Sequence, residues 1–431
     1  MKKIFYVVII LIACIGLTAC DVTTGVESSG STITTFVLHN GSKIHPIANL
    51  STYEFTVDNV HNIIYNTDSL PYLSYVDSLV PAIIGTAHGY IFNDTVLYNA
   101  QNFDTLDFSQ PVRIHTTSAD GKATRDYTVE VRVHQIDPYQ YVWEGLQSEI
   151  YTDEATAECL QVLNNRLWLF VQTATETKAF VSNDGNTWTL QTLTGFPIGI
   201  DLRSMVKCNN TLCIADAANT LYTSTDGITW LSNVTSGANI SRLLFAFDTT
   251  LYATAVTGTT QTLVACSDGA TWHNISILPS HFPVSGAGIW VDSTQAGTPR
   301  VYVVGGRDVN GVLLNSVWCS ENASYWANMA STAGFTPRED VAVVQYDSVL
   351  MVFGGRDDSG LVNDVQLVSP DHGISWKAPN AHQRIGTLFA PRYSANVATT
   401  ADFYLYIVSG RTATGFVKDV WRGRKNMLLF K

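Results

Sequence analysis

The sequence is poor in charged residues, and basic residues are the scarcer kind. Only 14% of its 431 residues are charged, and acidic residues outnumber basic ones by 37 to 25, which gives a net charge of −12. Nucleic-acid-binding domains expose clustered Lys and Arg, so we expect no nucleic-acid partner. With 46% hydrophobic and 11% aromatic residues, the composition favours a globular, strand-rich chain.

Short catalytic and cofactor-binding motifs are also missing. The sequence has no Gly-x-Ser-x-Gly, His-Glu-x-x-His, Cys-x-x-Cys or phosphate-loop pattern. Its ten His show no spacing typical of metal ligands. We therefore predict no metal and no cofactor, and no motif identifies a catalytic residue.

Cysteines are few, and only five of the seven follow Cys20. Cys208 and Cys213 flank one predicted hairpin turn, at positions that hold large apolar pairs such as Leu163 and Trp168 in an equivalent hairpin. An exported chain can form disulfides, so we expect either a Cys208–Cys213 disulfide or two free thiols. The remaining cysteines are expected to be buried as small apolar side chains.

The first 34 residues carry the signals of an export leader and a tether. Two lysines precede an apolar run over residues 4–16 that is too short to span a membrane, so residues 1–19 are interpreted as a signal peptide. Leu17-Thr18-Ala19-Cys20 resembles the bacterial lipobox, which implies lipid modification of Cys20 and anchoring at the outer membrane or cell surface. Residues 20–34 are rich in Ser, Thr and Gly, which is typical of a flexible tether.

Residues 35–137 are predicted to form an immunoglobulin-like β-sandwich. Short strand patterns lie at 35–38, 53–57, 90–92, 112–115 and 127–133, and the last alternates apolar and polar residues. Residues 118–122 form a hairpin turn ahead of it. About 100 residues of this kind suit a sandwich. The stretches 107–112, 119–121 and 126–129 resemble the cadherin-like modules of bacterial surface lipoproteins, which implies a spacer.

From about residue 139 the chain is repetitive. The turn signature Ser-x-Asp-Gly-x-Thr-Trp, or a close variant, occurs at 182–188, 224–230 and 266–272, with looser copies at 320–326 and 369–376. We expect the Asp to accept hydrogen bonds from its own turn, the Gly to supply a positive φ and the Trp to anchor the outgoing strand. The residues concerned are Asp184, Trp188, Asp226, Trp230, Asp268, Trp272, Trp326, Asp371 and Trp376.

With Trp143, one step before the first of these five copies, the chain has six Trp-bearing strands, which predict a six-bladed β-propeller over residues 138–431, behind the sandwich in an all-β chain. Trp143 fits the Trp series one step earlier, while the last repeat lacks its own Trp turn. We therefore expect the strand of Trp143 to complete the last blade and close the ring. The alternative closing strand is residues 427–430.

Three late repeats add a second signature, in which a Gly-Gly or Ser-Gly pair precedes Arg307, Arg356 or Arg411. These repeats resemble kelch repeats, and the turn-plus-Trp stretches resemble the Asp-boxes of sialidase-type propellers. The whole chain, from lipobox to propeller, resembles a family of Bacteroidetes lipoproteins of unknown function.

Arg307, Arg356 and Arg411 are the one candidate ligand-binding group. Each begins a loop between the second and third strands of its repeat, and such loops gather around one mouth of a propeller channel. Together they suit the carboxylate or sulfate groups of an acidic glycan. The alternative, which we favour, is that each Arg braces its own loop. The expected partners are Asp308, Asp357, Asp358 and Asp364.

The sequence leaves three functions open. The first is a monomeric, non-enzymatic surface protein that binds a glycan or protein through its propeller loops and touches the membrane only through its lipid. The second is a glycoside hydrolase or lyase, which would need opposed carboxylates; the Asp-boxes do not supply them, since in sialidase-like proteins they lie at the blade periphery. The third is a structural part of an outer-membrane assembly. Triplets such as Asp68-Ser69-Leu70 also resemble the O-glycosylation site of exported Bacteroidetes proteins.

Overall fold

The computed structural model describes residues 28–41, 47, 49–100, 104–258, 260–292, 299–329, 334–362 and 365–426. Within these residues, strands make up all the regular secondary structure apart from two short 3₁₀ helices, η1 (Leu50–Thr52) and η2 (Leu202–Ser204), which confirms the all-β class. No described helix is long and apolar enough to cross a membrane. The predicted signal peptide, Cys20 and residues 427–430 lie outside the described residues.

The chain divides into two compact units between Pro138 and Tyr139. The first unit has a two-stranded sheet, β1-β4, and a six-stranded sheet in the order β2-β3-β8-β7-β5-β6, in which β3 and β8 run parallel. Its strands are β1 (Ile33–Asn40), β2 (Phe55–Asp58), β3 (Ile63–Asn66), β4 (Leu79–Gly85), β5 (Gly89–Phe92), β6 (Val96–Leu97), β7 (Val112–Thr117) and β8 (Thr124–Glu130).

Both sheets of the first unit contribute to one hydrophobic core, which includes Phe36 from β1 and Tyr127 from β8, each at most 2% exposed. The predicted alternation of residues 127–133 is present, but β8 ends at Glu130. The reason is local: the Arg132 N–H donates to the Asn66 side-chain oxygen (2.7 Å) instead of continuing the strand ladder.

The described residues of the second unit form six sheets that follow one another along the chain, here called sheets 1 to 6, and a two-stranded ribbon of β28 (Arg356–Asp357) and β29 (Gly360–Leu361). Sheet 1 comprises β10 (Ala157–Leu163), β11 (Arg166–Gln172), β12 (Thr177–Ser182) and β13 (Thr189–Gln191). Sheet 2 comprises β14 (Val206–Cys208), β15 (Thr211–Ala215), β16 (Thr220–Ser224) and β17 (Leu231–Val234). Sheet 3 comprises β18 (Arg242–Phe247), β19 (Thr250–Thr257), β20 (Thr260–Cys266) and β21 (His273–Ile277). Sheet 4 comprises β22 (Gly288–Asp292), β23 (Arg300–Val304), β24 (Val317–Ser320) and β25 (Ala327–Asn328). Sheet 5 comprises β26 (Ala342–Tyr346), β27 (Val349–Phe353) and β30 (Gln366–Ser369). Sheet 6 comprises β31 (Asn396–Thr399), β32 (Leu405–Thr412), β33 (Gly415–Lys425) and β9 (Tyr141–Gln147).

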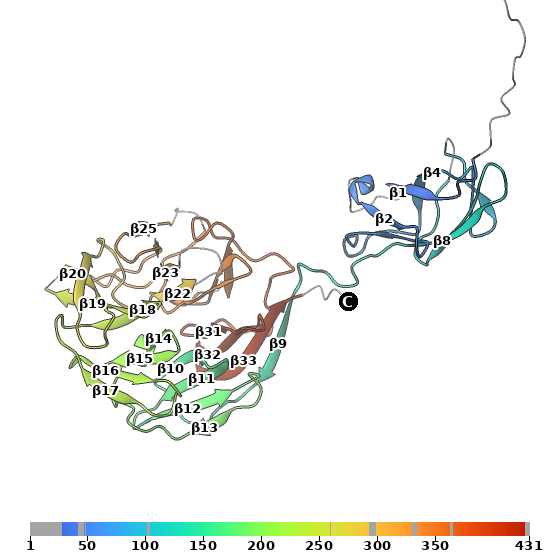
Figure 1. The fold of residues 1–431 in the computed structure, drawn as a ribbon. Coiled ribbons are helices and arrows are strands. Elements are labelled where there is room, and N and C mark those ends of the chain that lie inside the picture. Colours follow the sequence, from blue (N-terminus) through green and yellow to red (C-terminus); the bar gives the residue numbers. More distant parts are fainter. Residues whose placement is uncertain are drawn as a thin grey trace, which may run out of the picture. The chain divides into compact units, whose positions relative to one another are not determined.

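The six sheets form a ring. The first strand of each sheet contacts the first strand of the next, in the order β10, β14, β18, β22, β26 and β31, and β31 contacts β10 again. Figure 1 shows these strands innermost, with the later strands of each sheet farther out. This is the arrangement of a β-propeller.

Each interface between neighbouring sheets contains one indole of the predicted Trp series. Six hydrophobic clusters fill the six interfaces, and each contains or contacts one of these indoles. Starting at the interface of sheets 6 and 1 and ending at that of sheets 5 and 6, the indoles are Trp188, Trp230, Trp272, Trp326, Trp376 and Trp143. Trp230, Trp272 and Trp376 are each at most 5% exposed. The Trp repeat of the sequence is therefore a repeat of inter-sheet packing.

Sheet 6 is closed by β9, as predicted from Trp143. Strand β9 pairs antiparallel with β33, which places Trp143 opposite Gly423 and Trp421 opposite Gly145. Between these two pairs, Arg422 donates to Glu144 across the seam (2.8 Å). Gly423 leaves room for the Trp143 indole, which a Cβ there would meet at 2.5 Å, whereas a Cβ at Gly145 would make an ordinary contact with Trp421 at 3.8 Å.

Of the two alternatives for Cys208 and Cys213, the structure has free thiols and not the disulfide. In the β14–β15 hairpin Cys208 pairs with Thr211, and Cys213 pairs with Val206. The two cysteines are therefore diagonal neighbours, whose Cα atoms lie roughly 7–8 Å apart, beyond the usual disulfide range of about 4.4–6.8 Å. Cys159 and Cys266 are buried, as expected, while Cys319 is half-buried.

The seam predicts that Gly423→Ala destabilises the propeller. A Cβ at this position would lie 2.5 Å from Trp143 Cε3, so the indole or the strand must move. We expect a loss of about 1–3 kcal/mol in the free energy of unfolding, measured with urea. The control is Gly386→Ala, whose Cβ would meet nothing within 4 Å and which should change stability by less than about 0.5 kcal/mol. Equal stability of the two variants would contradict this account of ring closure.

Candidate functional site

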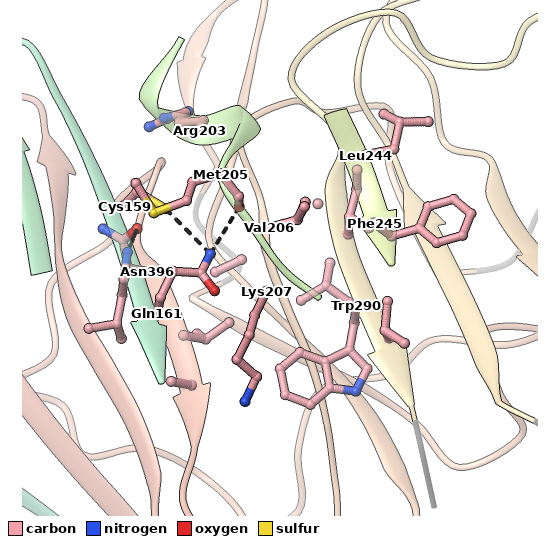
Figure 2. Close-up of a pocket in the computed structure, with 18 of the residues that line it drawn as sticks. Cys159, Gln161, Arg203, Met205, Val206, Lys207, Leu244, Phe245, Trp290 and Asn396 are labelled. Carbon is pink, nitrogen blue, oxygen red and sulfur yellow. Dashed lines mark hydrogen bonds between the residues drawn. The ribbon is translucent and has the colours of Figure 1, made fainter. Parts of the chain in front are cut away.

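The ring encloses an axial channel, which is the main candidate site. A cavity of about 1040 Å³ is lined by residues from the first strands of all six sheets. That volume lies at the upper end of small-molecule sites, which span about 300–1,000 Å³. Figure 2 shows Lys207 and Trp290 extending into the open space, while the Gln161 side chain is tied to the wall. The Gln161 amide donates to the Met205 carbonyl oxygen (2.9 Å).

One level of the channel can be defined from the strand register. On the second strands of the six sheets, equivalent and fully buried positions hold Leu167, Leu212, Leu251, Val301, Leu350 and Leu405. Their partners on the first strands all line the channel, and are Val162, Lys207, Ala246, Val291, Gln345 and Thr399. Lys207 is therefore the one charged residue at this level.

The Lys207 side chain is exposed in the channel, and partial desolvation by the surrounding protein lowers the pKa of its ammonium group. Sequence reasoning missed it, although a signal was present. The hairpins aligned through their polar turns place Lys207 where the other repeats have Val162, Ala246 and Gln345.

An ion pair spans one mouth of the channel. Arg203, in η2 ahead of sheet 2, donates to Asp340 Oδ1 (2.9 Å), which precedes β26 of sheet 5. Sheets 2 and 5 lie three places apart in a ring of six, so this pair crosses the channel. Arg242 supports Arg203 by donating to its carbonyl oxygen (3.1 Å), and it also pairs with Asp201 (3.5 Å).

The same mouth holds two of the three predicted arginines, and both already have carboxylate partners. Arg307 pairs with Glu339 (3.1 Å) and Asp358 (2.8 Å), while Arg356 pairs with Asp340 (2.9 Å) and Glu339 (3.3 Å). Glu339 and Asp340 are largely buried, with side chains 10% and 12% exposed. These two carboxylates therefore hold three arginines from sheets 2, 4 and 5, counting Arg203.

The bracing partners differ from those expected within each loop. Arg307 reaches Glu339 and Asp358 in the next repeat, because Asp308 is occupied by His281 (Nδ1 to Oδ2, 2.9 Å). Asp357 accepts from the Ser359 N–H and hydroxyl of its own turn, and Asp364 lies outside the described residues.

Arg411 differs from the other two predicted arginines. Its guanidinium lies over the Phe416 ring at 4.4 Å, and no ion pair involves it among the described residues. The structure therefore does not bring the three arginines together as one unpaired cationic site.

The predicted turn aspartates serve their own turns. Asp184, Asp226 and Asp268 each accept from the backbone N–H groups two and three residues ahead, at 2.8–2.9 Å. Asp371 accepts from the Ser375 N–H (2.9 Å). Hydrogen bonds from Thr271 and Ala270 lower the pKa of Asp268 to about 2. These carboxylates are therefore committed to local structure.

Glu158 is a buried acid that no sequence signal distinguished among 37 acidic residues. It lies in β10 with 1% of its surface exposed, and it accepts hydrogen bonds from the Tyr151 and Ser409 hydroxyls. Burial raises its pKa to about 7, although the two hydrogen bonds act in the opposite direction. Glu158 is therefore a candidate for proton transfer at the channel wall, with both oxygens held by hydroxyl groups.

Metal binding has no candidate residues in the described part of the chain, where no three or more His, Cys, Asp and Glu side chains gather in a ligand-like group.

Comparisons with known proteins identify both units. The model of the DUF6242 beta propeller domain matches residues 137–431, and that of the DUF6242 N-terminal domain, a domain of unknown function, matches residues 31–131. No curated protein matches the sequence significantly. Among solved structures, one described as the structure of YjhT is similar to 64% of this chain and 96% of its own, with 14% identity and a TM-score of 0.46.

The raised pKa of Glu158 predicts a pH-dependent stability. Because the folded-state pKa of about 7 exceeds the ordinary value of 4.5, the folded chain binds this proton more tightly. The resulting stabilisation is complete below pH 4.5 and is lost as the pH rises through 7. When the pH is raised from 5 to 8, the free energy of unfolding of the wild type should fall by up to about 3 kcal/mol relative to that of Glu158→Gln, measured by urea unfolding.

The matched control is Glu176→Gln, whose side chain is mostly exposed. It should keep the wild-type pH profile. Parallel profiles of the wild type and Glu158→Gln would show that Glu158 is charged in the folded protein throughout this range.

Proposed function

The chain belongs to the DUF6242 family, and on that premise we propose that it is a non-enzymatic binding protein that receives the end of a glycan in its propeller channel. We further infer that the propeller is six-bladed, with sheets 1 to 6 as its blades. The supporting observation is the channel itself, whose cavity of about 1040 Å³ is lined by all six first strands.

The channel suits a ligand better than the surrounding loop face does. At the loop face, the charges of Arg203, Arg307 and Arg356 are already neutralised by Glu339, Asp340 and Asp358. A ligand there would have to displace buried ion pairs, which is costly. Inside the channel, amide, ammonium and indole groups line a wall that is more polar than apolar, which suits a ligand rich in hydroxyl groups.

A hydrolase or lyase is the second candidate, and Glu158 is the observation that favours it. A carboxyl with a pKa of about 7 suits a general acid. Its two oxygens are, however, occupied by Tyr151 and Ser409, so we favour binding. Glu158→Gln separates the two functions when product release from a bound oligosaccharide is measured. An enzyme would release product in the wild type and lose this activity in the variant. A binding protein would release no product in either form.

For the first unit, we propose an immunoglobulin-like sandwich that acts as a spacer in a monomeric protein. Its two sheets around one core support this proposal. We also propose lipid attachment at Cys20 and a location at the outer membrane or cell surface, on the strength of the Leu-x-Ala-Cys sequence.

Lipid attachment is tested by expressing the full-length chain in a bacterium supplied with a labelled fatty acid. We expect label in the wild type and its loss in Cys20→Ser, with no loss in the control Cys159→Ser. Wild-type protein without label would contradict the anchor.

The binding proposal predicts that filling the channel abolishes binding. Thr399 lines the cavity, so Thr399→Trp should reduce binding to neutral and acidic oligosaccharides on a glycan array at least tenfold. The control is Thr189→Trp, since Thr189 is exposed on β13, the outermost strand of sheet 1. It should bind like the wild type. Absence of any wild-type binding, or full binding by folded Thr399→Trp, would rule out the channel as a glycan site.

A further inference from the structure

Lys207 is the one cation of the channel wall that lacks a carboxylate partner. The other two cations that line the cavity, Arg203 and Arg242, pair with Asp340 and Asp201. Within the described residues, no hydrogen bond or ion pair involves the Lys207 ammonium, and burial alone lowers its pKa. Partial desolvation disfavours the charged form of an unpaired ammonium, and an anion beside it would offset that cost.

The wall opposite Lys207 carries an indole that the Trp series does not explain. Trp290 lies on β22 of sheet 4 and packs against two clusters, one between sheets 4 and 5 and the other between sheets 5 and 6. Lys207 lies near the interface of sheets 1 and 2, where Gln161 of β10 bonds to Met205, two residues before Lys207. The clusters that Trp290 contacts therefore lie on the far side of the ring from Lys207, and the two side chains face each other across the channel. Figure 2 shows both of them reaching into the open space.

Two amides accompany these groups. Gln161 lies beside Lys207 (Figure 2). Gln345 lines the cavity from sheet 5. By strand alternation, Gln345 lies on the same face of β26 as Val343, which belongs to the cluster that Trp290 contacts. The channel thus offers one unpaired cation, one flat apolar surface and amides at neighbouring levels.

We propose that this part of the channel binds a uronic acid residue at the end of a glycan, with Lys207 on its carboxylate and Trp290 against its ring. This inference rests on the proposed function and names its ligand class. A pyranose has an apolar C–H face that packs on an indole, hydroxyls that suit amides, and, in a uronic acid, one carboxylate for one ammonium.

The charge of the protein argues against more highly charged ligands. The net charge of −12 repels polyanions at long range, and a single unpaired ammonium compensates a single negative charge. The terminal residue of a glycan carrying one carboxylate meets both conditions. Sulfated chains and nucleic acids meet neither.

The test compares two trisaccharides that differ only in their non-reducing end, one ending in glucuronic acid and the other in glucose. Binding to the purified full-length protein is measured by calorimetry. We expect the acid to bind at least tenfold more tightly. Lys207→Gln should weaken binding of the acid roughly 10- to 100-fold and leave the neutral sugar unchanged, while Lys207→Arg should retain the preference. Trp290→Leu should weaken both ligands.

The control is Lys178→Gln, because Lys178 lies on β12 and pairs with Asp153 outside the channel. It should bind both sugars like the wild type. Thermal unfolding checks that each variant is folded. If Lys207→Gln does not fold, Lys207→Arg still tests whether a cation at this position gives the preference for the acid.

Equal affinity for the two sugars, unchanged in Lys207→Gln, would overturn the uronate site. If Thr399→Trp still abolished that binding, the glycan-binding channel itself would stand. No wild-type binding of any glycan on the array would remove both proposals.

Discussion

The packing of one indole between each pair of neighbouring sheets is the interaction on which the propeller depends. A sheet with two apolar faces cannot bury both by itself, so each sheet needs a neighbour on either side. The clusters around Trp188, Trp230, Trp272, Trp326, Trp376 and Trp143 provide these contacts at all six interfaces. A missing sheet would expose two cores at once, which is why the ring must close. The Trp143–Gly423 and Trp421–Gly145 pairs accomplish this closure between strands more than 270 residues apart.

Much of this architecture was predictable because its signals are local. Trp188, Trp230 and Trp272 each follow an Asp-Gly turn by a fixed number of residues, so repeat length and strand position could be predicted from the sequence. The same counting placed Trp143 in the last sheet. The Cys208–Cys213 disulfide failed for a different reason. Whether two cysteines across a turn are opposed or diagonal depends on the strand register, and here the two-residue turn opposes Cys208 to Thr211 and leaves Cys213 on the diagonal.

The charged mouth could not be predicted, because ring closure brings together residues that are distant in sequence. Arg203 and Asp340 are 137 positions apart and belong to opposite sides of the ring. No spacing rule connects them, and many acidic residues are equally plausible partners for a given arginine. Lys207 is the exception, since aligned hairpins show a cation where other repeats have Val, Ala or Gln. Its significance depends on the absence of a partner, which only the described contacts of the channel reveal.

The distribution of paired charges separates structure from function in this channel. Glu339 and Asp340 are largely buried and hold Arg203, Arg307 and Arg356 by ion pairs, as stability requires. Glu158 is enclosed by Tyr151 and Ser409. The charge of Lys207 could be neutralised in the same way, since one Asp or Glu at a facing position would suffice. Gln161 and Gln345 at the channel wall are neutral instead. Sites where a protein departs from its own stabilising pattern are where ligands are expected to complete it, and Lys207 with Trp290 is such a site.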